Sequence, residues 1–175
     1  MGLEYVSALD SIELLADPVT AFLRSKPAAA LQLHVAEIDP DLADTAAFCE
    51  KYGIAMDASA NCVIIAGKRG EAITYAACMV LATTRADVNG VVRKRLDAKK
   101  ASFAPMDDAV ALSGMEYGGI TPFGLPEEWP VLVDSRVLDS EFACYGSGLR
   151  RSKLFGPGKA LLELPSVEVI EGLAN

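Results

Sequence analysis

Six glycines and prolines fall within the fourteen residues from Ser113 to Pro126, SGMEYGGITPFGLP. This density excludes a regular helix or a central strand, because glycine is costly inside both and proline lacks a backbone N–H. We expect an ordered loop with little side-chain bulk. Its N–H groups could hold a carbonyl oxygen or a developing oxyanion. Glycine and proline also build ordinary turns, so composition alone leaves both interpretations open.

The overall composition is that of a single folded domain. The chain has 175 residues, of which 51% are hydrophobic and 23% are charged, and such a chain can bury a sizeable core. Its apolar run from about Ala72 to Thr83 is too short to span a bilayer, which takes roughly 20 apolar residues. The N-terminus carries acids where a secretory signal would carry bases. We expect a cytoplasmic protein with no membrane partner.

Side chains that bind metals or act as nucleophiles are sparse. The four cysteines are scattered and form no CxxC pair, which favours buried, reduced thiols. Cys62 is accordingly interpreted as structural. The single histidine, His34, lies in an apolar run and is expected on a strand face or in the core. One histidine excludes multi-histidine metal sites and disfavours Ser-His-Asp catalysis. We expect no metal and no other cofactor.

The charge of the chain is unevenly distributed. The net charge of −8 disfavours long-range binding to a polyanion, and we expect no DNA partner. Half of the 16 lysines and arginines nevertheless fall in two short clusters, one at residues 93–100 and the other at residues 150–153. An acidic body with two basic patches suits a partner that touches one face. A solvated helix face is the alternative for the first cluster.

Local signals predict helices mixed with short strands. Helices are expected from Asp17 to Ser25, from Asp39 or Asp41 to Gly53, from Asp87 to Leu96 and from Met106 to Leu112. Strands are expected over residues 30–37, 61–66, 73–82, 131–134, 141–146 and 159–164, with a hairpin turn at residues 67–70. Because helices and strands do not alternate strictly, the pattern favours an α+β domain with a curved sheet.

Several segments resemble one known family in the same order. They are the helix that ends at Gly53-Ile54, the hairpin of residues 61–82, RLDAKK at 95–100, the glycine loop at 113–126, PVLVD at 130–134 and YGSG at 145–148. Together they resemble the YbaK-type aminoacyl-tRNA deacylases, which include the editing domain associated with prolyl-tRNA synthetase. The resemblance covers residues 36–165. Residues 1–35 then form an N-terminal helix and strand, and residues 166–175 form a C-terminal extension.

The resemblance implies a fold and an activity. The fold is a single α+β domain with a curved, barrel-like mixed β-sheet flanked by helices. The activity is hydrolysis of the ester between a wrong amino acid and a tRNA 3′ end, most often of tRNA for proline. The backbone of Gly118, Gly119 and Ile120 would stabilise the oxyanion while water attacks, so no side-chain nucleophile is needed.

The resemblance also implies binding residues and a partner. The expected substrate-binding residues are Thr121, Pro122, Asp134, Gly146, Ser147 and Gly148. From the charge cluster rather than from the resemblance, the expected tRNA contacts are Arg93, Lys94, Arg95, Lys99 and Lys100. A cap of the next turn for Asp134 and a turn serine for Ser147 are the alternatives. The partner is the 3′ end of an aminoacyl-tRNA, and a homo-oligomer is left open.

One position departs from the family pattern. The family has a functional lysine in a motif resembling A-K-T-L-V, and the matching residues here run from Ala60 to Ile64 with Asn61 in place of the lysine. By its position Asn61 is a candidate catalytic residue of the pocket, and a polar residue that merely begins the strand is the alternative. Asparagine can donate and accept hydrogen bonds but carries no positive charge. The alternative function is therefore a non-catalytic protein that binds an aminoacyl, nucleotide-like or protein partner, and hydrolysis of another small ester is a third hypothesis. A cation beside Asn61 would favour the enzyme.

Overall fold

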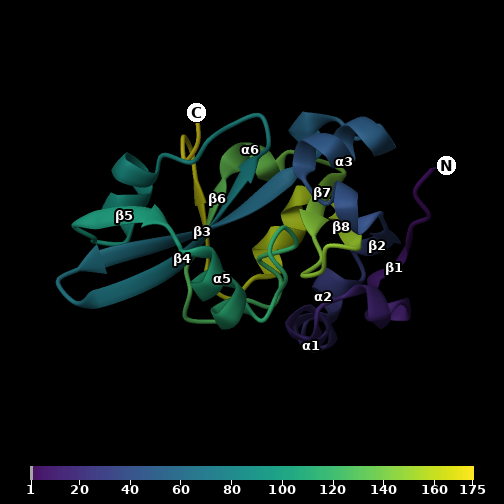
Figure 1. Ribbon diagram of the computed structural model, residues 1–175, viewed down its shortest axis with the longest axis horizontal. Coiled ribbons are helices and arrows are strands. Elements are labelled where there is room, and N and C mark those ends of the chain that lie inside the picture. The colour runs from purple at the N-terminus through teal and green to yellow at the C-terminus, as the bar shows by residue number, and fades with distance from the viewer. Residues whose placement is uncertain (1) are drawn as a thin grey trace.

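The computed structural model describes residues 2–175 as one α+β domain with two sheets (Figure 1). The smaller sheet has the strand order β1-β2-β8-β7, and the larger has the order β5-β3-β4-β6-β9. The strands are β1 (Val6–Ser7), β2 (His34–Glu37), β3 (Ala60–Arg69), β4 (Ala72–Leu81), β5 (Lys100–Phe103), β6 (Val131–Asp134), β7 (Ala143–Gly146), β8 (Ser152–Gly156) and β9 (Val167–Ile170).

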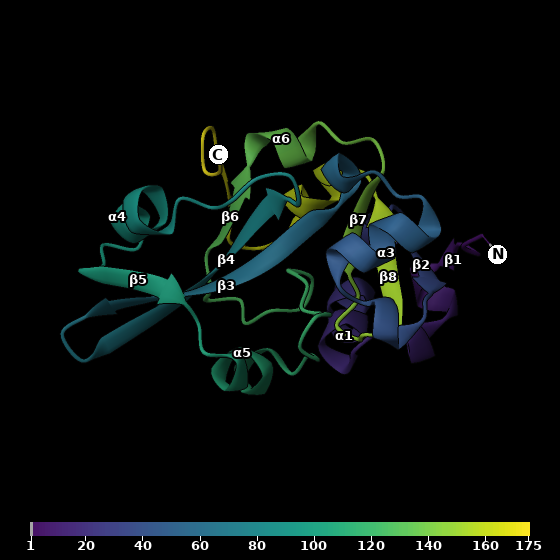
Figure 2. The same cartoon turned by 45° about the horizontal axis from the view of Figure 1, so that its top comes forward.

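Short helices surround the sheets. The α-helices are α1 (Asp17–Ser25), α2 (Pro27–Ala30), α3 (Thr45–Tyr52), α4 (Arg93–Arg95), α5 (Met106–Ser113) and α6 (Ser135–Leu138). A π-helical turn covers Val88–Val92, and 3-10 turns cover Ala8–Asp10, Ile12–Leu14, Pro40–Leu42, Met56–Ala58 and Gly158–Glu163. Figure 2 shows α5 and α4 on opposite sides of the long β3–β4 hairpin. No helix within residues 2–175 has the length and apolarity needed to cross a membrane.

The two sheets meet next to the beginning of β3, but together they do not close into a barrel. Ser59 and Cys144 form an isolated parallel bridge between them. Within the larger sheet, β5 pairs only with β3 and β9 pairs only with β6, so both remain edge strands. The predicted single α+β domain is confirmed, and its strands form two joined sheets rather than a closed barrel. The first and last strands of the described chain each belong to a sheet, because β1 pairs with β2 and β9 pairs with β6.

Several predicted element boundaries are wrong for identifiable reasons. The helix expected from Asp39 or Asp41 begins at Thr45, because Asp44 caps it by accepting hydrogen bonds from two backbone N–H groups. The hairpin turn is the two residues Gly70-Glu71, since Arg69 pairs with Ala72. In the segment predicted as a strand from residue 30, α2 occupies the first residue and β2 begins only at His34, which is exposed on the strand face.

The last part of the chain was the hardest to predict. The strand expected over residues 159–164 is a 3-10 helix, because Ala160 and Leu161 must both point into the core and strict alternation would separate them. Strands β8 and β9 were missed. Strand β8 is buried throughout although it begins with Ser152 and Lys153, and β9 is a short edge strand that includes a glutamate.

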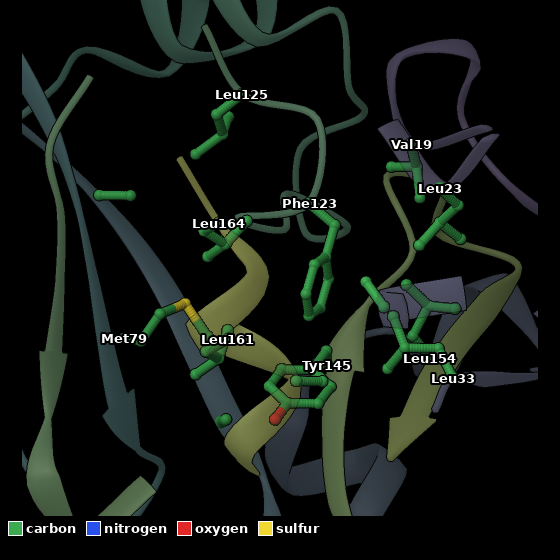
Figure 3. Packing of buried hydrophobic residues seen from close by; sticks show 14 of the residues in the cluster. Val19, Leu23, Leu33, Met79, Phe123, Leu125, Tyr145, Leu154, Leu161 and Leu164 are labelled. Atoms are coloured by element: carbon green, nitrogen blue, oxygen red, sulfur yellow. The ribbon is translucent and has the colours of Figure 1, made fainter. Parts of the chain in front are cut away.

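The main core lies between the sheets and the N-terminal helices (Figure 3). Phe123, which belongs to the glycine loop, packs edge-on against Tyr145 of β7, with 5.3 Å between ring centroids. The loop also presses against α1, where a Cβ on Gly124 would collide with the Pro18 carbonyl. Such contacts hold the loop in one conformation, as a site built from backbone groups requires.

Candidate functional site

A cavity of about 580 Å³ lies beside β3, next to the glycine loop. Its walls come from residues 43–45 before and at the start of α3, the first half of β3, the segment from β5 into α5, and the loops around residues 118 and 150. Among the residues predicted for the site, Asn61, Gly118, Ile120 and Gly146 line it. Segments distant in sequence thus meet at one cavity of a size typical for small-ligand sites.

Two glycine-loop residues that line this cavity have backbone donors without a partner. Gly118 has φ +84°, a left-handed conformation that favours glycine. In the described part of the chain, the N–H groups of Gly118 and Ile120 donate no hydrogen bond. Two such donors on one ordered loop can bind a carbonyl oxygen and stabilise an oxyanion derived from it.

Gly119 has a different position from that of its neighbours. It is buried and does not line the cavity, its N–H donates to the Glu116 carbonyl (2.9 Å), and its carbonyl accepts from Gly148 N–H (2.7 Å). Its φ is not in the left-handed region, but a Cβ would lie 2.7 Å from the backbone of Leu149. A Cβ on Gly146 would collide with the Gly119 carbonyl. The two loops therefore pack backbone against backbone, and glycine is required for this contact.

Three further predicted residues support the loops rather than line the cavity. Thr121 is buried, and Pro122 lines a separate hollow beside α1. Ser147 is buried and shares a 2.7 Å hydrogen bond with the Ser152 hydroxyl. The hydroxyl of Thr121 is the one buried side-chain polar atom among residues 2–175 that has no hydrogen-bond partner.

Asp134 is placed away from the cavity. Its side chain is 1% exposed, caps α6, and accepts hydrogen bonds from Arg136 (2.9 Å) and from the backbone N–H of Ala174 (3.0 Å). Burial opposes ionisation, but the hydrogen bonds from Arg136 and Ala174 outweigh it and lower the pKa of Asp134. The carboxylate thus joins β6 to the C-terminal residues and is not presented to a ligand.

Two residues that were not predicted for the site, Arg150 and Asp44, supply charge to the cavity. Arg150 lines it and donates to the carbonyls of Tyr117 (3.2 Å) and Pro40 (3.0 Å). Asp44 lines it as well, and Thr45 donates to the side-chain oxygen of Asn61 (3.1 Å). The ion pairs of residues 2–175 do not include Arg150. The sequence signal that could have placed Arg150 in the site is its position two residues after the YGSG loop.

The remaining charges of the second basic cluster lie elsewhere. Arg151 donates to the Glu13 carbonyl. Lys153 is buried on β8, donates to the Ala43 carbonyl (3.2 Å) and lies 5.4 Å from the ring centre of Phe48. Burial lowers the pKa of Lys153. This lysine therefore supports the segment that precedes Asp44 rather than lining the cavity itself.

The thiols are poor nucleophiles at neutral pH. Cys62 lines the cavity, but burial and then the neighbouring Cys78 thiol raise its pKa. Burial likewise raises the pKa of Cys78 and of Cys144 to about 12. Within residues 2–175, no three Cys, His, Asp or Glu side chains cluster so as to hold a metal ion. The groups that can act on a ligand here include backbone N–H groups and the side chains of Asp44, Asn61 and Arg150, with the hydroxyls of Thr45 and Tyr117 on the same lining.

The raised thiol pKa values predict a loss of stability in alkali. An unfolded thiol ionises near pH 9, whereas Cys78 and Cys144 resist ionisation to about pH 12 in the folded protein. The unfolded state therefore loses protons first, and each thiol lowers the free energy of unfolding by about 1.4 kcal/mol per pH unit across this window. Urea denaturation between pH 8 and 11 measures the effect. Cys78→Ala should reduce the slope, and an unchanged slope would contradict this assignment.

The fold and the cavity define a class: a small α+β domain with a site built largely from loop backbone. Residues 39–164 match the aminoacyl-tRNA editing domain family, and the chain belongs to that family. A comparison with curated proteins finds no match.

Solved structures share the fold. A candidate trans-editing enzyme for prolyl tRNA synthetase has a TM-score of 0.74 at 18% identity, over 89% of this chain and 94% of that one. A hypothetical protein, APE2540, has a TM-score of 0.75 at 19% identity, over 91% and 100% of the two chains. A scaffold from a study of epitope backbone grafting has a TM-score of 0.74 at 20% identity, over 89% and 95%.

Proposed function

We propose that this protein hydrolyses, in trans, the ester of mischarged aminoacyl-tRNA, with tRNA for proline as its substrate. One observation carries the proposal: the unused N–H groups of Gly118 and Ile120 belong to a cavity that also contains the cation of Arg150. Family membership supports the substrate class. The similarity to a candidate trans-editing enzyme for prolyl tRNA synthetase supports the choice of tRNA.

The proposed reaction needs no protein nucleophile. The ester carbonyl oxygen accepts hydrogen bonds from Gly118 and Ile120, and water adds to the carbonyl carbon. The negative charge that develops on the oxygen is stabilised by these donors and by Arg150, and one such donor contributes about 10²–10³ in rate. The bond to the ribose oxygen then breaks, and a proton from the attacking water, relayed by a ribose hydroxyl, completes the leaving alcohol.

Asp44 is the proposed partner of the substrate's α-ammonium group. Asp44 lines the cavity and is exposed, with one carboxylate oxygen accepting the capping hydrogen bonds of α3, whereas Asp134 is buried and paired with Arg136. Asp44 also caps α3, which fixes its direction. Ile64, Ala60 and Ala109 form an apolar part of the wall that suits a small side chain. An acid and a cation on one cavity match the ammonium and the developing oxyanion of an aminoacyl ester.

The experiment that tests the proposal is a substrate panel. The protein is incubated with alanyl- and cysteinyl-tRNA for proline, with correctly charged prolyl-tRNA and with amino acid methyl esters, and ester loss is followed. We expect the mischarged tRNAs to be hydrolysed fastest. Faster loss of the methyl esters would favour a small-ester hydrolase. Binding of tRNA without any hydrolysis would favour a non-catalytic binding protein, which is the function that Asn61 in place of lysine suggests.

Asn61→Lys is expected to raise the rate on alanyl- and cysteinyl-tRNA for proline, by up to about tenfold. A lysine at this cavity position adds a cation beside the ester, where a partly desolvated site strengthens electrostatic attraction. The gain is limited because Arg150 already lines the same cavity. Wild type and variant are compared side by side, with Asn61→Gln as a neutral control. A slower lysine variant would show that the native arrangement of Arg150 and Asn61 is complete.

A further inference from the structure

A further hollow, of about 480 Å³, lies along strand β5. Its lining includes the side chains of Lys68, Arg93, Lys99 and Lys100 and no aspartate or glutamate. Lys68 and Lys100 are direct partners across the β3–β5 pairing. The three lysines are exposed, and the ion pairs of residues 2–175 include none of these four cations. In a chain of net charge −8, this hollow is a local site for anions.

Large exposed apolar side chains gather at the neighbouring cavity. Phe103, at the end of β5, is 65% exposed, and Tyr117, on the glycine loop, is 59% exposed. Both line the cavity described above. Exposed aromatic rings on the lining of a cavity are suited to stack on unpaired nucleobases, a contact that tolerates any base.

Strand β5 connects the two features. Phe103 and Lys100 are three residues apart, about 10 Å along an extended strand, so their side chains leave opposite faces of β5 and a ligand that contacts both must pass over its free edge. β5 lies beside the projecting β3–β4 hairpin (Figure 1), and it is an edge strand, so no further strand pairs with its outer edge. The order along this path is the ester cavity, then an aromatic ring, then a group of cations.

We propose that β5 guides the single-stranded 3′ end of the tRNA, with Phe103 stacking on an unpaired base and the hollow formed by Lys68, Arg93, Lys99 and Lys100 binding the phosphates that follow. This inference rests on the proposed function for the identity of the RNA, and it assigns the direction from which the RNA enters. It adds Lys68 and Phe103 to the predicted contacts.

The basic residues at positions 93–100 are divided between two different hollows. Arg95 pairs with Glu168 of β9, and Lys94 lies with it at a different hollow that also includes Glu171. Arg93, Lys99 and Lys100 face the acid-free hollow instead. Lys94 is therefore the matched control: it has the same charge, lies on the same segment and is also exposed, but it is outside the proposed path.

The test measures the affinity for uncharged tRNA for proline across a salt series. The double variant Lys99→Ala/Lys100→Ala should bind at least tenfold more weakly in low salt, and its log–log salt slope should fall by about 1.4 to 1.8, as expected for two lost phosphate contacts. Phe103→Ala should bind about tenfold more weakly with little change in slope, and Phe103→Trp should restore binding. Lys94→Ala should bind like wild type.

The outcomes separate this inference from the proposed function. Equal losses for Lys94→Ala and the double variant would overturn the inference, because the effect would then be general charge rather than a path. Unchanged binding by the double variant and by Phe103→Ala would overturn it as well. If the double variant loses binding selectively while no variant cleaves any ester, the RNA path stands and the proposed hydrolysis fails.

Discussion

Gly119→Val is expected to lower the free energy of unfolding by about 3 kcal/mol or more. Gly119 is buried, and a Cβ there would lie 2.7 Å from the backbone of Leu149, which cannot rotate away as a side chain can. Overpacking a tight interior typically costs about 1–3 kcal/mol, and a branched side chain against backbone belongs at the upper end. The hydrogen bond from Gly148 to the Gly119 carbonyl would be displaced too. Chemical denaturation measures the loss.

Gly53→Ala provides the comparison for this variant. Gly53 has φ +68°, and no heavy atom lies within 4 Å of the position that a Cβ would occupy, so alanine there carries the left-handed strain without a collision. It should cost about 1 kcal/mol. A Gly119→Val protein as stable as wild type would show that the contact between the two loops is loose. The account of the loops as a rigid backbone platform would then be wrong.

Arg150→Met is expected to reduce kcat/KM on mischarged tRNA by about 100-fold. Arg150 is the cation that lines the cavity with Asn61, and it joins the loops at Pro40 and Tyr117 through its two terminal nitrogens. Methionine keeps a long flexible stem but removes the charge that would stabilise the developing oxyanion. Steady-state kinetics on alanyl-tRNA measures the effect, and the melting temperature should fall only modestly because these hydrogen bonds lie near the surface.

Arg150→Lys separates charge from geometry. Lysine keeps the positive charge, but its single ammonium group cannot donate to both carbonyls with the spacing of a guanidinium. We expect a rate between those of wild type and Arg150→Met. If Arg150→Met were as active as wild type, the catalytic contribution of this cation would be refuted, and the loop N–H groups alone would have to stabilise the oxyanion.

The sequence predicted features that depend on local backbone chemistry. Helix ends at Gly53 and Gly114 and the cap at Asp87 follow from left-handed glycine and from a side chain that accepts backbone hydrogen bonds. The long hairpin follows from two β-rich runs around a glycine turn. These signals involve neighbours in sequence, so one chain is enough to recognise them.

Tertiary contacts were harder to predict. Motif order brought Asn61, Gly118 and Gly146 to one cavity, but it could not show that Gly119 faces Leu149 or that Asp134 faces Arg136. Arg150 was visible only as part of a charge cluster, because its role depends on the packing of its loop against residues 40 and 117. Strand β9 was missed because its pairing with β6 is parallel and distant in sequence.

The most direct measurement of the central claim is a single-turnover assay with the protein in excess over alanyl-tRNA for proline. The loss of the alanyl ester is timed against the same RNA without protein and against wild-type protein with prolyl-tRNA. We predict that the protein accelerates loss of the alanyl ester at least ~100-fold and leaves the prolyl ester nearly untouched, and that Arg150→Met abolishes most of the acceleration. An alanyl ester that decays at its protein-free rate while the RNA is bound would contradict the account.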